Sequence, residues 1–297
     1  MSTERTESRF IGELRKGWWH PNVRPAVSRA IYAAIAEAVG DTWAPGDIER
    51  ALGKAHDRER TSEGLSNKFR KIWTDQSVPS LSTISEVTRA FPTCRADYWS
   101  EHPLFYLLDG RQLKNENFAR SAIHYALDSL HGRIRMEVWK HEIDYKQWTG
   151  ELLKPFDNRF VRDVFDSDGF AELDTLDRLT LSTALAKMAY ASKDWLAYDQ
   201  TVWVAYLEFG HTLATHNPLL MGWKWLTKLY EEQLWRPHNE KCRSSVSISG
   251  YSKTDLAKWF LRAQSDGRPL PPPEIIDLAE WDETTLGKLD QSLNRLK

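Results

Sequence analysis

Residues that could bind a metal ion gather at two places, each of which contains one histidine. His141-Glu142-Ile143-Asp144 combines three ligand types, but adjacent helical residues point about 100° apart, so a solvated helix end is the simpler interpretation. His238 and Cys242 are four residues apart and would share a helical face. The dipeptide Arg236-Pro237 argues against a helix there, and no second pair has matching spacing. The sequence therefore predicts no metal site.

Acidic residues are concentrated in one run between two helical patterns, comprising Asp163, Asp166, Asp168, Glu172, Asp174 and Asp177. The run lacks a calcium loop's spacing of acidic residues around a central glycine and a closing glutamate, so it is interpreted as a solvated loop that caps the next helix. Neither a Gly-x-Ser-x-Gly motif nor a glycine-rich phosphate loop is present. We predict no catalytic residue and no cofactor. A metal-dependent enzyme that uses the acidic run ranks third among the functions considered, behind DNA binding and protein interaction.

The composition is that of a folded protein without a disulfide framework. The 297 residues are 41% hydrophobic and 28% charged, which suffices for one large domain or two ordinary ones. Two cysteines lie far apart, and no run of eighteen apolar residues or secretory signal is present. The sequence therefore favours a cytoplasmic protein with no membrane partner.

Positive charge is concentrated locally, although the net charge of the chain is −2. The segment from Arg50 to Trp73 contains seven basic residues and three acidic residues. This local excess is typical of a surface that attracts phosphate, and also of an ordinary solvated helix face.

Helical periodicity dominates the remaining pattern. Apolar residues recur at helical spacing over 25–39, 45–55, 62–74, 80–91, 117–145, 152–165, 176–191, 201–213, 219–235 and 254–263. One alternating segment, 244–249, predicts a strand, and 266–273 is a proline-rich linker before a short helix at 284–296. Most of the nine tryptophans after residue 110, Trp203, Trp223 and Trp235 among them, are expected in the core.

The segment from Gly64 to Phe91, GLSNKFRKIWTDQSVPSLSTISEVTRAF, resembles the second half of Cro/lambda-repressor-like (Xre-type) helix-turn-helix domains. Leu65-Ser66 matches the start of the recognition helix, and Pro79-Ser80-Leu81 matches the start of the helix that follows. The resemblance implies that the helix enters the major groove of DNA while basic side chains contact phosphates. The implied DNA-binding residues, with the two arginines of the preceding loop, are Arg58, Arg60, Ser62, Ser66, Asn67, Lys68, Arg70 and Lys71.

We therefore predict an all-α protein with an N-terminal arm (1–21), a helix-turn-helix-like bundle (22–108), a larger helical C-terminal domain (109–265), and a linker with a terminal helix (266–297). The predicted function is sequence-specific binding of double-stranded DNA, as in a bacterial or phage-type transcriptional regulator. The C-terminal domain would then form a homodimer or contact a protein partner. The alternative is a protein-interaction or host-defence component in which the helix-turn-helix unit is a docking module with a solvated basic face.

Overall fold

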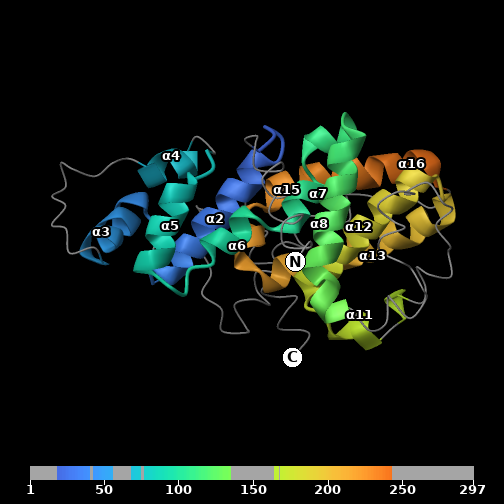
Figure 1. Cartoon of the computed structure of the whole chain (residues 1–297). Helices are drawn as coiled ribbons and strands as arrows, with labels where there is room; N and C mark the ends of the chain where they lie inside the picture. Colours follow the sequence, from blue (N-terminus) through green and yellow to red (C-terminus); the bar gives the residue numbers. More distant parts are fainter. Residues whose placement is uncertain are drawn as a thin grey trace, which may run out of the picture. The chain divides into compact units, whose positions relative to one another are not determined.

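The computed structural model describes residues 19–40, 43–55, 68–74, 77–134, 164–166 and 168–242. Helices are the only regular elements in these segments, so the predicted all-α class is confirmed (Figure 1). None of the described helices has both the length and the apolarity needed to cross a membrane. The described residues divide into two compact units, each built from segments that are distant in the sequence.

The first unit, called here the α2 unit, comprises the described residues of 24–101 together with 210–227. Its central helix, α2 (Arg24–Ala38), is alanine-rich and has eleven buried residues out of fifteen. Helices α14 (Asn217–Met221), α6 (Ala96–Ser100) and α4 (Lys68–Thr74) pack against α2, while α3 (Pro45–Ala55) and α5 (Leu81–Ala90) complete the unit. Small side chains allow close approach: a Cβ atom on Gly222 would lie 3.4 Å from the carbonyl oxygen of Ala26.

Helix boundaries in the α2 unit follow local capping chemistry, as the sequence predicts. Helix α3 begins at Pro45 and carries Asp47 in its first turn, where a proline and an acidic residue are both favourable. Ser80 caps α5: its hydroxyl accepts a hydrogen bond from the backbone N–H of Thr83, and the helix ends one residue before Phe91.

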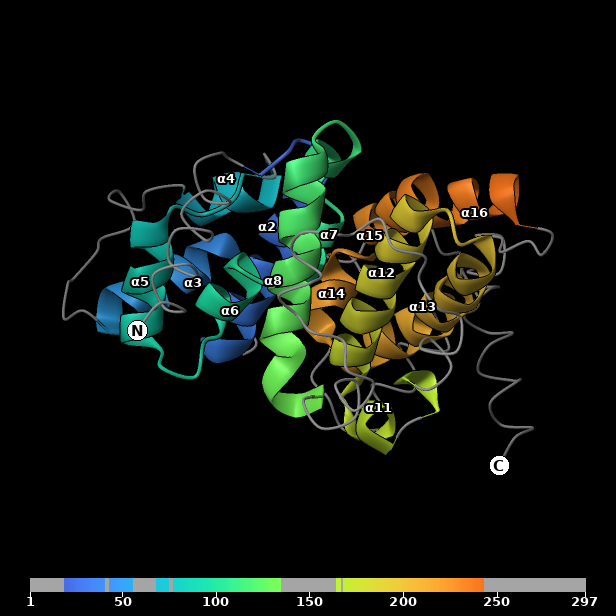
Figure 2. The ribbon, with the colours of Figure 1, turned by 45° about the vertical axis from the view of Figure 1, so that its right-hand side comes forward.

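The second unit, called here the α12 unit, comprises the described residues of 19–23, 102–209 and 228–242. Its helices are α7 (Pro103–Leu107), the 3-10 turn η2 (Gly110–Leu113), α8 (Glu116–Ile134), α11 (Asp168–Glu172), α12 (Thr175–Ser192), the π-helix η4 (Glu231–Trp235) and α16 (Arg236–Lys241). Residues 195–209 of α13 (Trp195–Thr215) and residues 228–230 of α15 (Trp223–Tyr230) also belong to it. Helix α12 packs against α8 and α7 (Figure 2).

The structure corrects the expectation that Arg236-Pro237 excludes a helix. Helix α16 begins at Arg236 and continues directly from the π-helix η4, so Pro237 lies inside an unbroken helical run rather than at a helix end. The carbonyl of Gln233, which an N–H at position 237 would normally reach, instead lies 3.4 Å from the Nζ atom of Lys187. His238 and Cys242 therefore share one helical turn after all.

The tryptophan expectation is only partly correct. Trp235 is completely buried, but Trp223 is partly exposed and Trp203 has 37% of its surface exposed. The buried face of α13 is formed by Val202, Ala205 and Phe209, and Trp203 lies one residue, or about 100°, away from Val202. Apolar residues of α13 lie on its exposed side as well as on its buried side. The periodicity of apolar residues therefore could not show which side of the helix is buried.

Several predicted features lie outside the described residues. They are the N-terminal part of the 62–74 helix, the cluster His141-Glu142-Ile143-Asp144, the strand at 244–249, the proline-rich linker and the terminal helix. In the acidic run, Asp174 is the N-cap of α12, with its carboxylate 2.8 Å from the backbone N–H of Asp177, and the predicted capping role is confirmed there.

We expect Ser80→Ala to destabilise the α2 unit by about 1 kcal/mol, since the first turn of α5 loses its side-chain acceptor. Urea unfolding followed by circular dichroism measures the change. Ser85→Ala, an exposed position within the same helix, is the matched control and should leave the midpoint nearly unchanged. Equal effects of the two substitutions would show that the cap contributes nothing.

Candidate functional site

Helix α4, which carries part of the predicted DNA-binding surface, is anchored by its apolar residues. Phe69 is 1% exposed and Ile72 is 3% exposed. The carboxylate of Glu49, itself buried on α3, accepts a hydrogen bond of 3.3 Å from the backbone N–H of Phe69. This contact ties α3 to α4.

Helix α2 holds the other end of α4. The hydroxyl of Ser28 lies 3.1 Å from the carbonyl oxygen of Ile72 and 2.9 Å from that of Ser77. The guanidinium of Arg29 stacks over the ring of Trp73 at 3.5 Å, and Tyr32 lies 4.9 Å from the same ring. These contacts fix the rotation of α4 about its axis and so decide which side chains point outward.

Two basic side chains occupy the outward face of α4. Arg70 and Lys71 are both exposed, while the residues on either side of them, Phe69 and Ile72, are buried. Lys68 is only partly exposed and forms an ion pair with Glu86 of α5 at 3.2 Å. The basic face of α4 is therefore defined here as Arg70 and Lys71.

Helix α4 has no acidic residue, and the acidic residues of α3 and α5 all interact within the unit. Asp47 pairs with Arg50, Glu49 accepts the N–H of Phe69, and Glu86 pairs with Lys68. Further exposed basic side chains on these helices are Lys54 and Arg89. The described helices α3–α5 thus expose more positive than negative charge, as the local composition predicts.

The structure places only three of the eight predicted DNA-binding residues. Lys68, Arg70 and Lys71 lie on α4. Arg58, Arg60, Ser62, Ser66 and Asn67 lie outside the described residues, so their roles stay predictions. Sequence reasoning missed the positioning residues Glu49 and Ser28; a signal for Glu49 was present, because it follows Ile48 and precedes Leu52 on a largely apolar helix face.

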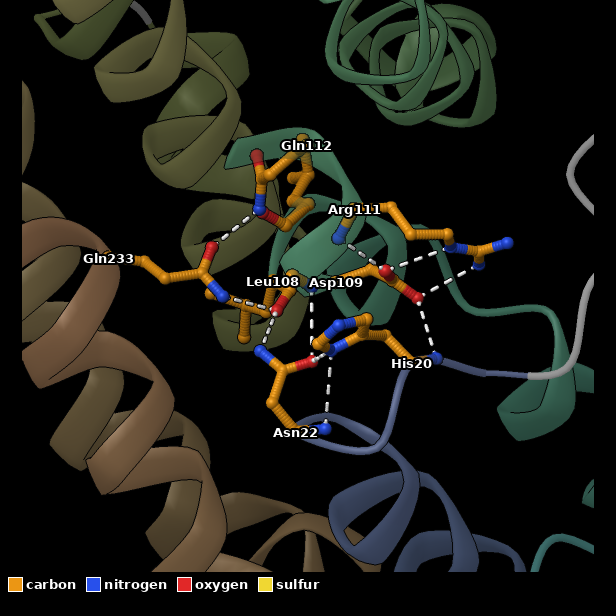
Figure 3. Close-up of polar contacts among 9 residues, drawn as sticks. His20, Asn22, Leu108, Asp109, Arg111, Gln112 and Gln233 are labelled. Atoms are coloured by element: carbon orange, nitrogen blue, oxygen red, sulfur yellow. Dashed lines mark hydrogen bonds and ion pairs between the residues drawn. The ribbon is translucent and has the colours of Figure 1, made fainter. Parts of the chain in front are cut away.

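A second concentration of polar contacts surrounds Asp109 in the α12 unit (Figure 3). This carboxylate is completely buried and accepts two hydrogen bonds of 2.9 Å from the guanidinium of Arg111. It also accepts the backbone N–H groups of Arg111, at 2.9 Å, and His20, at 3.2 Å. The charge of a buried carboxylate needs such compensation, and here four donors supply it.

The side chain of Asn22 continues this network. Its carbonyl oxygen lies 2.5 Å from Nδ1 of His20 and accepts the backbone N–H of Gly110 at 3.1 Å. Its amide nitrogen lies 3.5 Å from the carbonyl oxygen of Leu108, which also accepts a hydrogen bond from Gln233. A Cβ atom on Gly110 would lie 2.6 Å from the His20 ring, so the contact requires glycine. Figure 3 shows the three chain segments meeting at these contacts.

Lys187 of α12 closes the network at Gln233. Its ammonium donates a hydrogen bond of 3.0 Å to the side-chain oxygen of Gln233, which also accepts from Gln112. Burial lowers the pKa of Lys187 to about 7, because the charged form loses its hydration. A lysine with this pKa can exchange a proton near neutral pH, but its contacts are with amide groups that hold the fold together.

Comparisons with protein families, with curated proteins and with solved structures find no match for this chain. The function must therefore be argued from the charge and geometry described above.

The stability of the α12 unit should depend on pH through Lys187. Since its pKa is about 7 when folded and ordinarily 10.5, the unfolded chain holds a proton between these values that the folded chain lacks. Stability should therefore rise as pH increases from 7 toward 10, with a slope of at most about 1.4 kcal/mol per pH unit.

Urea unfolding of the parent chain and of Lys187→Met at pH 6.5, 8 and 9.5 measures this effect. The parent should gain stability relative to the variant as the pH rises, because other titrating groups contribute equally to both. A difference that stays constant with pH would contradict a lowered pKa for Lys187.

Proposed function

We propose that this protein binds double-stranded DNA through the α2 unit, with the basic face of α4 contacting phosphates. The observation that carries the proposal is the orientation of α4: Phe69 and Ile72 are buried against the unit, so Arg70 and Lys71 project outward. Charged side chains on a rigid, anchored helix are suited to repeated contact with a regularly spaced phosphate backbone.

The distribution of acidic residues supports the same proposal. Carboxylates beside the basic face would repel phosphates, and on α3–α5 each of them pairs with a neighbour inside the unit. Lys68 is partly exposed and pairs with Glu86, so it would position α4 against α5, whereas the exposed side chains of Arg70 and Lys71 would contact phosphates.

Sequence-specific recognition is the finer part of the proposal, and it rests on the resemblance to Cro/lambda-repressor-like domains. In that arrangement, residues at the start of the recognition helix reach the base edges, which would assign the role to Ser62, Ser66 and Asn67. A transcriptional regulator is the simplest protein with these properties.

The double variant Arg70→Ala/Lys71→Ala should weaken binding to all DNA sequences by a similar factor. Each phosphate contact contributes about 0.9 to the slope of log affinity against log salt, so the slope should become shallower by nearly two. Anisotropy titrations of a labelled duplex between 50 and 200 mM salt provide the measurement.

The matched control is Lys114→Ala, which removes an exposed lysine of the α12 unit. It should leave both affinity and slope unchanged. If the double variant keeps the parent's circular dichroism spectrum and binds DNA as the parent does, α4 does not contact DNA. The basic face is then an ordinary solvated surface, and the interaction-module alternative is favoured.

Specificity has a separate test at Asn67. Its amide can pair with adenine in the major groove, so Asn67→Ala should cost about 1–3 kcal/mol on a duplex selected from a random library. On random DNA the loss should be much smaller. Equal losses on both duplexes would assign Asn67 to the backbone rather than to base recognition.

A further inference from the structure

Three side chains with different metal-binding atoms meet in the α12 unit. Asp199 lies on α13, His238 on α16, and Cys242 directly after α16. One oxygen, one nitrogen and one sulfur atom from these residues all lie within 4.8 Å of one another. The distance from Nε2 of His238 to Oδ1 of Asp199 is 2.7 Å.

The backbone holds the three residues in place. The N–H of Cys242 donates to the carbonyl of His238 at 2.8 Å, which closes the last turn of α16 and sets the spacing of the two side chains. Tyr198, adjacent to Asp199, is buried, donates its hydroxyl to the carbonyl of Leu234 at 2.8 Å and lies 5.9 Å from the His238 ring. These contacts fix α16 against α13.

We propose that Asp199, His238 and Cys242 bind one divalent metal ion of the zinc class. Carboxylate, imidazole and thiolate are the ligands that zinc prefers, and three protein ligands leave a fourth position for water. His238 is completely buried, whereas the side chain of Asp199 is 30% exposed and Cys242 is partly exposed. An ion can therefore enter from the side of Asp199 and Cys242.

The surroundings of His238 suit a metal ligand. Its Nδ1 atom lies 3.3 Å from the side-chain oxygen of Asn239, so in the metal-bound form an Nδ1–H would donate there and the Nε2 lone pair would be directed at the ion. A second partner of this kind fixes the orientation of the imidazole in metal sites. Each ring nitrogen thus has an oxygen nearby, which disfavours a catalytic arrangement in which the imidazole removes the Cys242 proton.

Binding requires small movements of Asp199 and of the Cys242 side chain, whose Sγ now lies 3.6 Å from the carbonyl oxygen of Trp195. Tetrahedral zinc with Zn–O and Zn–N distances of about 2.0–2.1 Å separates these two ligand atoms by roughly 3.3 Å. The carboxylate would withdraw from His238 by about half an ångström, and its partial exposure allows this. The ion would then connect α13 to α16 in place of the direct hydrogen bond.

Cobalt(II), which takes zinc sites and reports on them by its colour, is the probe for the test. The full chain, freed of metal with a chelator, should bind one Co²⁺ per molecule and develop the near-ultraviolet charge-transfer band of a thiolate ligand. Added Zn²⁺ should displace the cobalt and abolish the band. Absence of stoichiometric binding, or binding without the band, overturns the proposal and leaves a structural His–Asp pair only.

Variants then assign the ligands. Cys242→Ser should remove the band and weaken Zn²⁺ binding by more than the 10–100-fold typical of losing an outer-shell partner. The matched controls, Cys94→Ala at the other cysteine and His211→Ala at an exposed histidine, should keep band and affinity. Cys242 is partly exposed, so its variant should fold; if it retains the band and the parent's affinity, the proposed site is wrong.

Discussion

Two helices are apolar on so many sides that each must be enclosed, and the rest of the fold follows from this constraint. Helix α2 buries eleven of its fifteen residues, and α12 buries twelve of eighteen. Burying the apolar surface of such helices lowers the free energy of the folded chain, because that surface is removed from water. In the α2 unit, enclosure brings α14, distant in the sequence, against α2 and fixes α4 beside it.

Enclosing such helices also buries polar groups, and each unit compensates for them locally. In α12, three buried hydroxyl groups each donate a hydrogen bond to a backbone carbonyl one turn earlier in the same helix; they belong to Thr180, Ser182 and Thr183. In the α2 unit, burial raises the pKa of Tyr32, which stays neutral and donates to the carbonyl of Trp43 at 2.6 Å. These four buried hydroxyl groups thus each have a hydrogen-bond partner within their own unit.

The proposed functions of the two units use this rigidity in different ways. In the α2 unit, buried contacts fix the rotation of α4, and the exposed charges are then presented in one orientation. In the α12 unit, the π-helix η4 and the helix α16 that follows it bring His238 and Cys242 to the side of α13 that carries Asp199. A π-helix shifts the register of side chains relative to an α-helix, and such segments are frequent at functional sites.

The sequence by itself determined the helical class, the boundaries of α3 and α5, and the caps at Ser80 and Asp174, because periodicity and capping act within a few residues. It also located the basic segment that contains Arg70 and Lys71.

The sequence could not show that Lys68 pairs with Glu86, that Glu49 contacts α4, or that Asp199 lies beside His238. Those pairings join residues 18 to 39 positions apart, so only the packing of helices against one another brings them together. Pro237 shows the same limit. Its local effect predicts the end of a helix, because proline has no N–H to donate to the carbonyl of Gln233. In the folded chain, Nζ of Lys187 from α12 lies 3.4 Å from that carbonyl, and the helix continues.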